Sequence, residues 1–375
     1  MSKPIPVRPV LSPAALRRRA LLTATGAALL AACGGSSDAP TPAPAPAPGP
    51  VAVLISAANQ DVVARAATNV VVSAATTGAV APLAAGGSSG GSKRPAGTGG
   101  LSLATAGSIG GLMQQVNEYV LQPRFALTGA VAAAAGPVRA LARVVQTEAC
   151  GVSGNITITI DDTDNSASLS AGDSIGFSFN ACRSGLGETI DGGLSLAVST
   201  VAGANLSGTL TYTQFTVSTA EATLAVNGAV TLAYTEVGTL ATYRTVIGAA
   251  GLTTRVNAPP FTDEITLRAG FEQVVTSDRA AVAPGSTATG LNTARIDGTL
   301  STLQLGGVVT VATVTPFVRY SIDPYPRAGQ LTATGANGSR VRVTAVSVTT
   351  VRVELDANGD GSYEQSRELP WGTLL

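Results

Sequence analysis

The chain has 375 residues, with 23 Lys and Arg side chains, 23 Asp and Glu side chains and no histidine. A balanced charge gives no electrostatic footprint for nucleic acid. The lack of histidine excludes Ser-His-Asp triads, Cys-His pairs and His-ligated metals. We therefore expect a protein that is not an enzyme.

The N-terminal segment has the pattern expected of a secretion signal. Three arginines, Arg17, Arg18 and Arg19, precede an apolar run that ends at Leu30-Ala31-Ala32-Cys33. The run is too short to span a hydrocarbon core of about 30 Å. The segment resembles the lipobox of bacterial lipoproteins, which implies that residues 1–32 are removed and that Cys33 is lipidated. The alternative is an ordinary signal peptide with Cys33 as a bystander.

The same segment predicts a location in the cell envelope. Arg18-Arg19-Ala20-Leu21-Leu22 also resembles the twin-arginine export signal, but Arg17 stands where that signal has Ser or Thr, so both export routes stay open. In lipoproteins of this kind, the lack of Asp after the cysteine, here Gly34, implies passage to the outer membrane. Removing Lys3, Arg8 and Arg17–Arg19 lowers the 23 basic side chains to 18 against 23 acids, so the mature protein is mildly acidic.

A helical and low-complexity region, residues 53–149, follows a Pro/Ala-rich tether at 33–52. Residues 85–100 are Gly- and Ser-rich and predict a disordered loop. A first helix is expected from Ser56, its N-cap, because apolar residues recur every fourth position at Ala58, Val62, Ala66, Val70 and Ala74. Two more helices are predicted, one at about 109–121 and one from Pro137 to about Glu148.

Residues 150–375 predict a mainly β domain. Apolar residues alternate with polar ones in three clear runs: Leu224 to Tyr234, Ile265 to Phe271, and Val351 to Leu355. The alternation slips between Tyr212 and Phe215, which predicts a bulge. Pro316 predicts an edge strand or a break. We expect a large antiparallel meander that forms a curved sheet, an open barrel or a sandwich, preceded by two or three short helices.

The two remaining cysteines predict a disulfide. Cys150 and Cys182 form an even pair in an oxidising compartment and bracket an expected hairpin with strands at 155–160 and 174–180. Pairing Ile160 with about Gly172 brings the cysteines together at the open end of the hairpin. The alternative is a pair of free or redox-active thiols, which no CxxC motif supports.

Two acidic turns match the spacing of calcium loops in part. In residues 162–173, oxygen-bearing side chains fall at positions 1, 3, 5, 7, 9 and 12, namely Asp162, Asp164, Ser166, Ser168, Ser170 and Asp173. In the second turn, Asp356, Asn358 and Asp360 match positions 1, 3 and 5, but Arg367 stands at position 12. The alternative is a pair of hairpin turns in which the side chains cap their own backbone.

The whole layout resembles uncharacterised proteobacterial lipoproteins. The similarity rests on the lipobox, the tether, the Asp162-to-Asp173 loop, the Phe179-Asn180-Ala181-Cys182 ending and the late Trp371. It implies a lipid-anchored protein but no known activity. We expect a non-catalytic scaffold or interaction module whose partner is an envelope protein. The alternatives are a periplasmic carrier of an apolar ligand and a calcium-stabilised adhesion domain.

Overall fold

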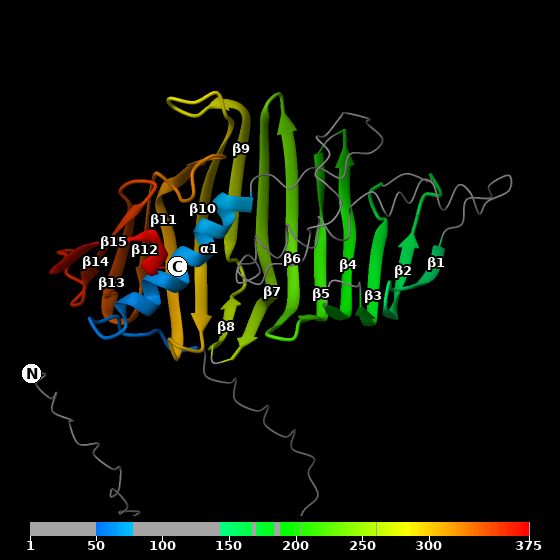
Figure 1. Ribbon diagram of the computed structural model, residues 1–375, viewed down its shortest axis with the longest axis horizontal. Coiled ribbons are helices and arrows are strands. Elements are labelled where there is room, and N and C mark those ends of the chain that lie inside the picture. The colour runs from blue at the N-terminus through cyan, green and yellow to red at the C-terminus, as the bar shows by residue number, and fades with distance from the viewer. Residues whose placement is uncertain are drawn as a thin grey trace, which may run out of the picture. The chain divides into compact units, whose positions relative to one another are not determined.

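A computed structural model describes residues 50–77, 143–166, 170–183, 188–203, 205–259 and 261–374. One long helix, α1, is followed by fifteen strands, a 3-10 turn (η2) and a short C-terminal helix (α5) (Figure 1). The bounds are α1 Gln60–Thr77, β1 Arg143–Ala149, β2 Ser153–Asp161, β3 Ser174–Arg183, β4 Thr189–Ala202, β5 Asn205–Ser218, β6 Thr223–Val237, β7 Leu240–Ala258, β8 Phe261–Leu267, β9 Glu272–Val282, β10 Thr289–Thr302, β11 Gly307–Tyr320, β12 Ala328–Thr334, η2 Ala336–Gly338, β13 Arg340–Ala345, β14 Thr350–Asp356, β15 Gln365–Pro370 and α5 Trp371–Leu374.

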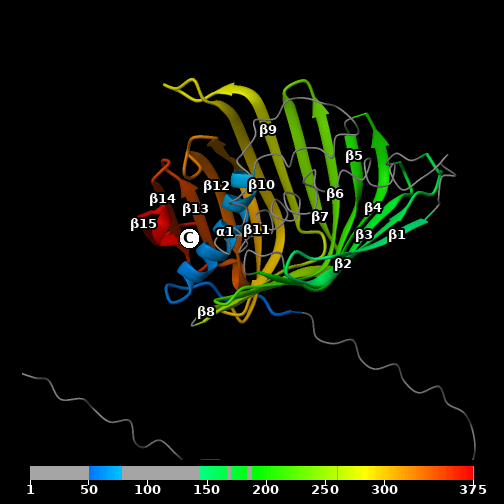
Figure 2. The same ribbon diagram turned by 45° about the vertical axis from the view of Figure 1, so that its right-hand side comes forward.

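The strands form one antiparallel sheet in which neighbours in sequence are neighbours in space. The order runs from β1 to β8, continues through β10 to β15, and leaves β9 paired with both β7 and β10. The expected meander and its curvature are therefore confirmed (Figures 1 and 2). Apart from the β8–β9 turn, which lies within the sheet, consecutive turns alternate between the two ends of the sheet. One end carries the β2–β3, β6–β7 and β11–β12 turns, and the other carries the β10–β11, β12–β13 and β14–β15 turns.

Alternating apolar residues give the sheet a buried inner face. In β6, the predicted face from Leu224 to Tyr234 is at most 8% exposed, and in β14, Val351 and Leu355 are at most 1% exposed. The run predicted from Ile265 to Phe271 ends early, because β8 stops at Leu267 and Phe271 lies in the turn before β9. Phe271 is nevertheless buried in the same core.

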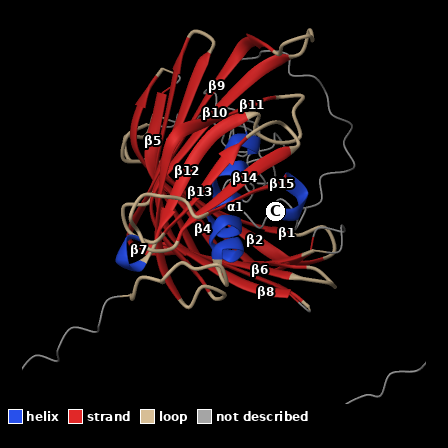
Figure 3. Ribbon diagram, turned by 90° about the vertical axis from the view of Figure 1, so that its left-hand side faces the viewer, coloured by secondary structure: helices blue, strands red, loops and turns tan. Residues whose placement is uncertain are grey.

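Helix α1 lies along the inner side of the curve and packs against β9 to β13 and α5 (Figures 2 and 3). Its small buried face, with Val63, Ala67 and Val71 fully inaccessible, permits this close approach. The helix begins at Gln60, four residues after the predicted N-cap, because the Ser56 carbonyl closes a turn with the amides of Asn59 and Gln60. No helix in the described part of the chain combines the length and the hydrophobicity that a bilayer crossing requires.

A row of bulges bends strands β2 to β7 at the same level. The strand pairing shifts register at three glycines. Gly154 lies opposite Ala181, Gly192 opposite Gln214, and Gly228 opposite Gly251. All six residues have positive φ. Side chains supply acceptors for two displaced amides: Asp191 binds the Ala181 N–H and Asn227 binds the Gln214 N–H. Bulges of this kind introduce curvature, and the one predicted between Tyr212 and Phe215 is confirmed.

Two local predictions need correction. Residues 143–149, expected in a helix that ended near Glu148, form strand β1, paired with β2 over seven residues. Pairing with β2 overrides the helical pattern here, and the valines at 144 and 145 suit a strand. Pro316 lies in β11 between β10 and β12, so it is not on an edge. Strand β11 continues through Pro316, and only its pairing with β10 and β12 shifts register there.

The hairpin that carries the acidic loop has a different register from the expected one. Ile160 pairs with Ile175, and the Asp162-to-Asp173 loop lies beyond the last pair, Asp161 with Ser174. The predicted helix at 109–121, the Gly/Ser-rich loop at 85–100, Cys33 and the tether up to residue 49 lie outside the described residues.

Candidate functional site

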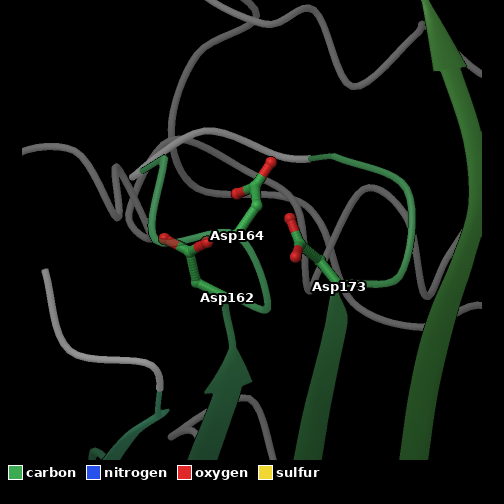
Figure 4. A group of neighbouring side chains, drawn as sticks. All are labelled: Asp162, Asp164 and Asp173. Atoms are coloured by element: carbon green, nitrogen blue, oxygen red, sulfur yellow. The ribbon is translucent and has the colours of Figure 1, made fainter.

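The first acidic loop joins the ends of β2 and β3. The carboxylates of Asp162, Asp164 and Asp173 point toward one another there, and one oxygen of each lies within 4.8 Å of the others (Figure 4). Asp162 and Asp164 each accept a hydrogen bond from the Ser166 amide, at 3.1 and 3.0 Å. The hydrogen bonds to Asp164 lower its carboxyl pKa, with the Ser166 side chain as the largest cause.

Asp173 closes this loop from the inside. Its side chain is buried, and it accepts four hydrogen bonds, two from the amide and hydroxyl of Thr163 and two from the amide and hydroxyl of Ser170. Burial alone raises the pKa of this carboxyl, but the four donors outweigh burial and the pKa is lowered. Asp173 therefore stays ionised, and its carboxylate holds the loop together by binding the amides and hydroxyls of Thr163 and Ser170.

The second acidic turn joins β14 and β15. Asp356 is fully buried, and its two oxygens accept the amides of Gly359 and Gly361 at 2.6 and 3.0 Å. Asp360 accepts the Ser362 amide, and this hydrogen bond is the largest cause of its lowered pKa. Asn358 bonds Asp360 through its side-chain amide.

Glu364 completes the second group, which the sequence pattern missed. One oxygen of each of Asp356, Asp360 and Glu364 lies within 4.8 Å of the others. Counting twelve positions along a calcium loop leads instead to Arg367, whose side chain pairs with Asp61 of α1. If the turn is instead expected to end where the next strand begins, Glu364, directly before β15, is identified as the third carboxylate.

The two acidic loops do not form one site. The β2–β3 loop and the β14–β15 turn lie at opposite ends of the sheet and near opposite edges. Among the described residues, these are the two groups of three or more metal-ligating side chains. Each group offers carboxylate oxygens, the ligand type that calcium prefers. In each, the most buried carboxylate already binds amides of its own loop.

The disulfide predicted between Cys150 and Cys182 is present, with the two Cα atoms 5.4 Å apart. Cys150 directly follows β1 and Cys182 lies in β3, so the bond ties the outermost strand to the third strand. It lies at the end of the hairpin opposite to the Asp162-to-Asp173 loop. Its position gives it a structural role at the sheet edge.

The inner face of the sheet is apolar and buried. Its residues in β2 to β7 form one apolar core cluster, which includes Ile158, Phe177, Phe179, Leu194, Tyr212, Phe215 and Val226. Phe179, Phe215 and Tyr212 make edge-to-face ring contacts, with centroids 5.8 and 6.0 Å apart. Helix α1 packs against the other half of the same face, β9 to β13.

The β11–β12 turn contains an ion pair that the sequence pattern did not predict. Asp323, 6% exposed, forms a bidentate pair with Arg327 and accepts the Tyr320 amide in the β11–β12 turn. Arg327 is the largest cause of the lowered pKa of Asp323. Its guanidinium also lies 4.5 Å from the centre of the Tyr320 ring. These contacts close a turn, and we assign them a structural role.

Comparison of the chain with protein-family models, with curated proteins and with solved structures finds no match.

Proposed function

We propose that this protein is a non-catalytic lipoprotein of the cell envelope, anchored in the outer membrane through Cys33, whose sheet serves as a scaffold or interaction module. The observation that carries the proposal is the lipobox at Leu30-Ala31-Ala32-Cys33, with its arginine cluster and Pro/Ala-rich tether. The domain faces either the periplasm or the cell surface, and its partner is a protein of the envelope.

The way the chain enters the sheet is compatible with a tether. Val51 and Val53 exchange backbone hydrogen bonds with Val308 at the start of β11, each 3.0 Å long. The Ile55 amide donates to Ser339 Oγ beside η2. The polypeptide is therefore fastened to one end of the sheet, where the β10–β11 and β12–β13 turns lie. The turns at the other end, including the Asp162-to-Asp173 loop, lie away from this attachment point.

The chemistry of the described acids supports a role without catalysis. The carboxylates that come together do so in two separate turns, and those of Asp173 and Asp356 are committed to amides of their own loops. In glycoside hydrolases, for comparison, the two catalytic carboxylates flank the substrate bond that is cleaved. The sequence contains no histidine to replace them.

Lipidation is tested by metabolic labelling with a radioactive fatty acid and by membrane fractionation. We expect label in the wild-type protein, and we expect the Cys33→Ser variant to lose both the label and the membrane association. An unlabelled wild-type protein, or a variant that fractionates with the membrane as before, contradicts the proposal. The Cys150–Cys182 disulfide serves as a folding control, because Cys33 takes no part in it.

A second candidate function is the transport of an apolar ligand. The inner face of β2 to β7 has the hydrophobic and aromatic composition that ligand sites use, whereas the burial of its residues in one core cluster favours the scaffold. Mass spectrometry of material that co-purifies with the membrane-extracted protein separates the two functions. A stoichiometric lipid supports the carrier, and a protein partner without bound lipid supports the scaffold.

A third candidate is a calcium-stabilised binding domain, favoured by the two groups of three carboxylates. A ligand that binds only the folded state raises its stability. Thermal melts in millimolar calcium and in EDTA test this function. A higher midpoint in calcium that Asp164→Asn or Asp360→Asn abolishes supports it, and equal midpoints exclude it.

A further inference from the structure

The two edges of the sheet differ in how they are protected. At one edge, β15 has six residues, ends in Pro370, which has no N–H, and continues directly into α5. At the other edge, β1 has seven residues without proline, and its pairing with β2 is unbroken. Proline and short length prevent an edge strand from pairing with another chain. The β1 edge has no proline, and it is one residue longer than β15.

The outward-facing backbone groups of β1 follow from its pairing with β2. Cys150 N–H donates to the Gly154 carbonyl, so residues 150, 148, 146 and 144 form the hydrogen-bonded pairs with β2. The N–H and C=O groups of the alternate residues then point away from the sheet. These residues are Arg143, Val145, Thr147 and Ala149.

The β1 edge is exposed and held in place. Six of its seven residues are exposed, and Val145 is 56% exposed. The disulfide fastens the end of the strand to β3, which reduces the ordering that binding would require. Among the described residues, none pairs with the outward backbone groups of β1, and such a strand edge is the surface that recognition by strand addition uses.

We propose that β1 pairs with β1 of a second copy of this chain, antiparallel and about a two-fold axis at Gln146. In this register Arg143 faces Ala149 of the other copy, Val145 faces Thr147, and Gln146 faces itself. All four outward-facing residues of each strand then fall in hydrogen-bonded pairs, and all seven residues are used. No two like charges face each other, because Glu148 lies opposite Val144.

The pairing unites two sheets through one strand from each copy. An interface of this size is small, so the dimer is weak in dilute solution. Anchoring both copies in one membrane raises their effective concentration. The affinity of the dimer in the membrane therefore depends on the proposed lipid anchor. The register in which the two β1 strands pair does not depend on it.

A single cysteine at the symmetry axis tests the register. Between the two copies, Gln146 occupies a non-hydrogen-bonded pair, in which Cα atoms lie about 4.5 Å apart, within the range that a disulfide bridges. We expect Gln146→Cys, in the full-length lipoprotein in its own membrane, to give a disulfide-linked dimer on mild oxidation. Thr147→Cys is the matched control, because it faces Val145 of the other copy, and we expect at least a tenfold smaller dimer fraction.

Proline substitutions test the pairing itself. Val145→Pro in the Gln146→Cys background removes an outward N–H that β2 does not use, and we expect at least a tenfold loss of cross-linked dimer. Glu368→Pro removes an outward N–H on the opposite edge and should leave the dimer unchanged. An intact Cys150–Cys182 disulfide, read by mass spectrometry, shows that β1 is still in place.

Three results overturn the proposal: no dimer from Gln146→Cys, equal dimer from Thr147→Cys, or equal loss from the two prolines. A Gln146→Cys adduct with a different protein assigns the edge to that partner and also overturns it. Repeating the oxidation with the Cys33→Ser protein at high concentration separates this proposal from lipidation. A dimer there supports the β1 register even if Cys33 carries no lipid.

Discussion

Gly192 shows how single residues set the curvature of the sheet. Its φ is +90°, and a Cβ atom there would lie 2.2 Å from the carbonyl oxygen of Gln214. Gln214, opposite, also has positive φ, and the strands bend at this level. An L side chain therefore meets both backbone strain and a steric clash with a neighbouring strand.

We expect Gly192→Ala to lower the free energy of unfolding by about 2–4 kcal/mol, since strain and clash add. Urea denaturation followed by circular dichroism measures the loss. Gly248→Ala is the matched control in β7, because its Cβ would approach no atom closer than 3.5 Å. Equal stability of the two variants would show that the bulge row does not need glycine.

Asp173 is the residue on which the acidic loop depends. Its buried carboxylate accepts four hydrogen bonds, and its folded-state pKa is lowered. A carboxyl group whose pKa is lower in the folded state than in the unfolded state stabilises the protein above the unfolded pKa, about 3.9. That contribution is lost as the pH falls through the folded pKa.

We expect Asp173→Asn to cost about 1–3 kcal/mol at pH 7, because charge-assisted hydrogen bonds are replaced by weaker ones. The difference from wild type should shrink as the pH falls from about 5 to below the folded pKa. Chemical denaturation at a series of pH values measures this. Glu221→Gln, at an exposed turn position, is the control. A difference that stays constant down to pH 2 would contradict the assignment.

At the scale of elements, β1 depends on its neighbours. It has one neighbouring strand in the sheet, β2, and most of its side chains are exposed. The Cys150–Cys182 bond compensates by linking the end of β1 to β3. Edge elements with few buried contacts open before the core does, so the disulfide acts where the sheet is weakest.

Replacing both Cys150 and Cys182 by serine should therefore lower the free energy of locally opening β1 and β2, by up to about 3–4 kcal/mol in the chain-entropy account. Hydrogen exchange followed by mass spectrometry should show the largest loss of protection in β1 and β2, with β6 and β13 little changed. Cys33→Ser is the control that leaves this bond intact. A uniform loss of protection across the sheet would contradict a local role.

At the scale of the whole domain, α1 and the sheet are joined by contacts between residues far apart in sequence. The Asn292 side chain donates to the Ala75 carbonyl across 217 residues, and Ile55 donates to Ser339 across 284. The C-terminal helix meets α1 as well, where Arg65 binds the Leu374 carbonyl. The inner face of β9 to β13 is thus completed only when the N-terminal segment docks.

Deleting residues 50–77 should expose this face. We expect increased binding of the dye ANS and a red shift in the fluorescence of Trp371, the only tryptophan, which is fully buried and stacks on Tyr325. A variant that begins at Pro50 retains α1 and should keep the wild-type melting midpoint. If the deletion variant melts as the wild type does, α1 is not part of the core.

Sequence by itself determined the features that depend on near neighbours along the chain. The alternation of apolar and polar residues predicted the inner face of β6 and β14. The interruption of that alternation between Tyr212 and Phe215 predicted the bulge there, and the two cysteines that bracket one hairpin predicted the disulfide. These succeed because a strand's two faces and a hairpin's closure are fixed within some tens of residues.

Only the tertiary structure decided the rest. Residues 143–149 are helical by pattern, but hydrogen bonding to β2 makes them a strand. Glu364 joins Asp356 because the β14–β15 turn folds back sooner than a calcium loop would. The docking of α1 on β9 to β13 depends on how far the sheet curves, which many strands set together. The docking of α1 is a sum over distant contacts that no local window of sequence contains, whereas the grouping of Glu364 with Asp356 depends on one short hairpin.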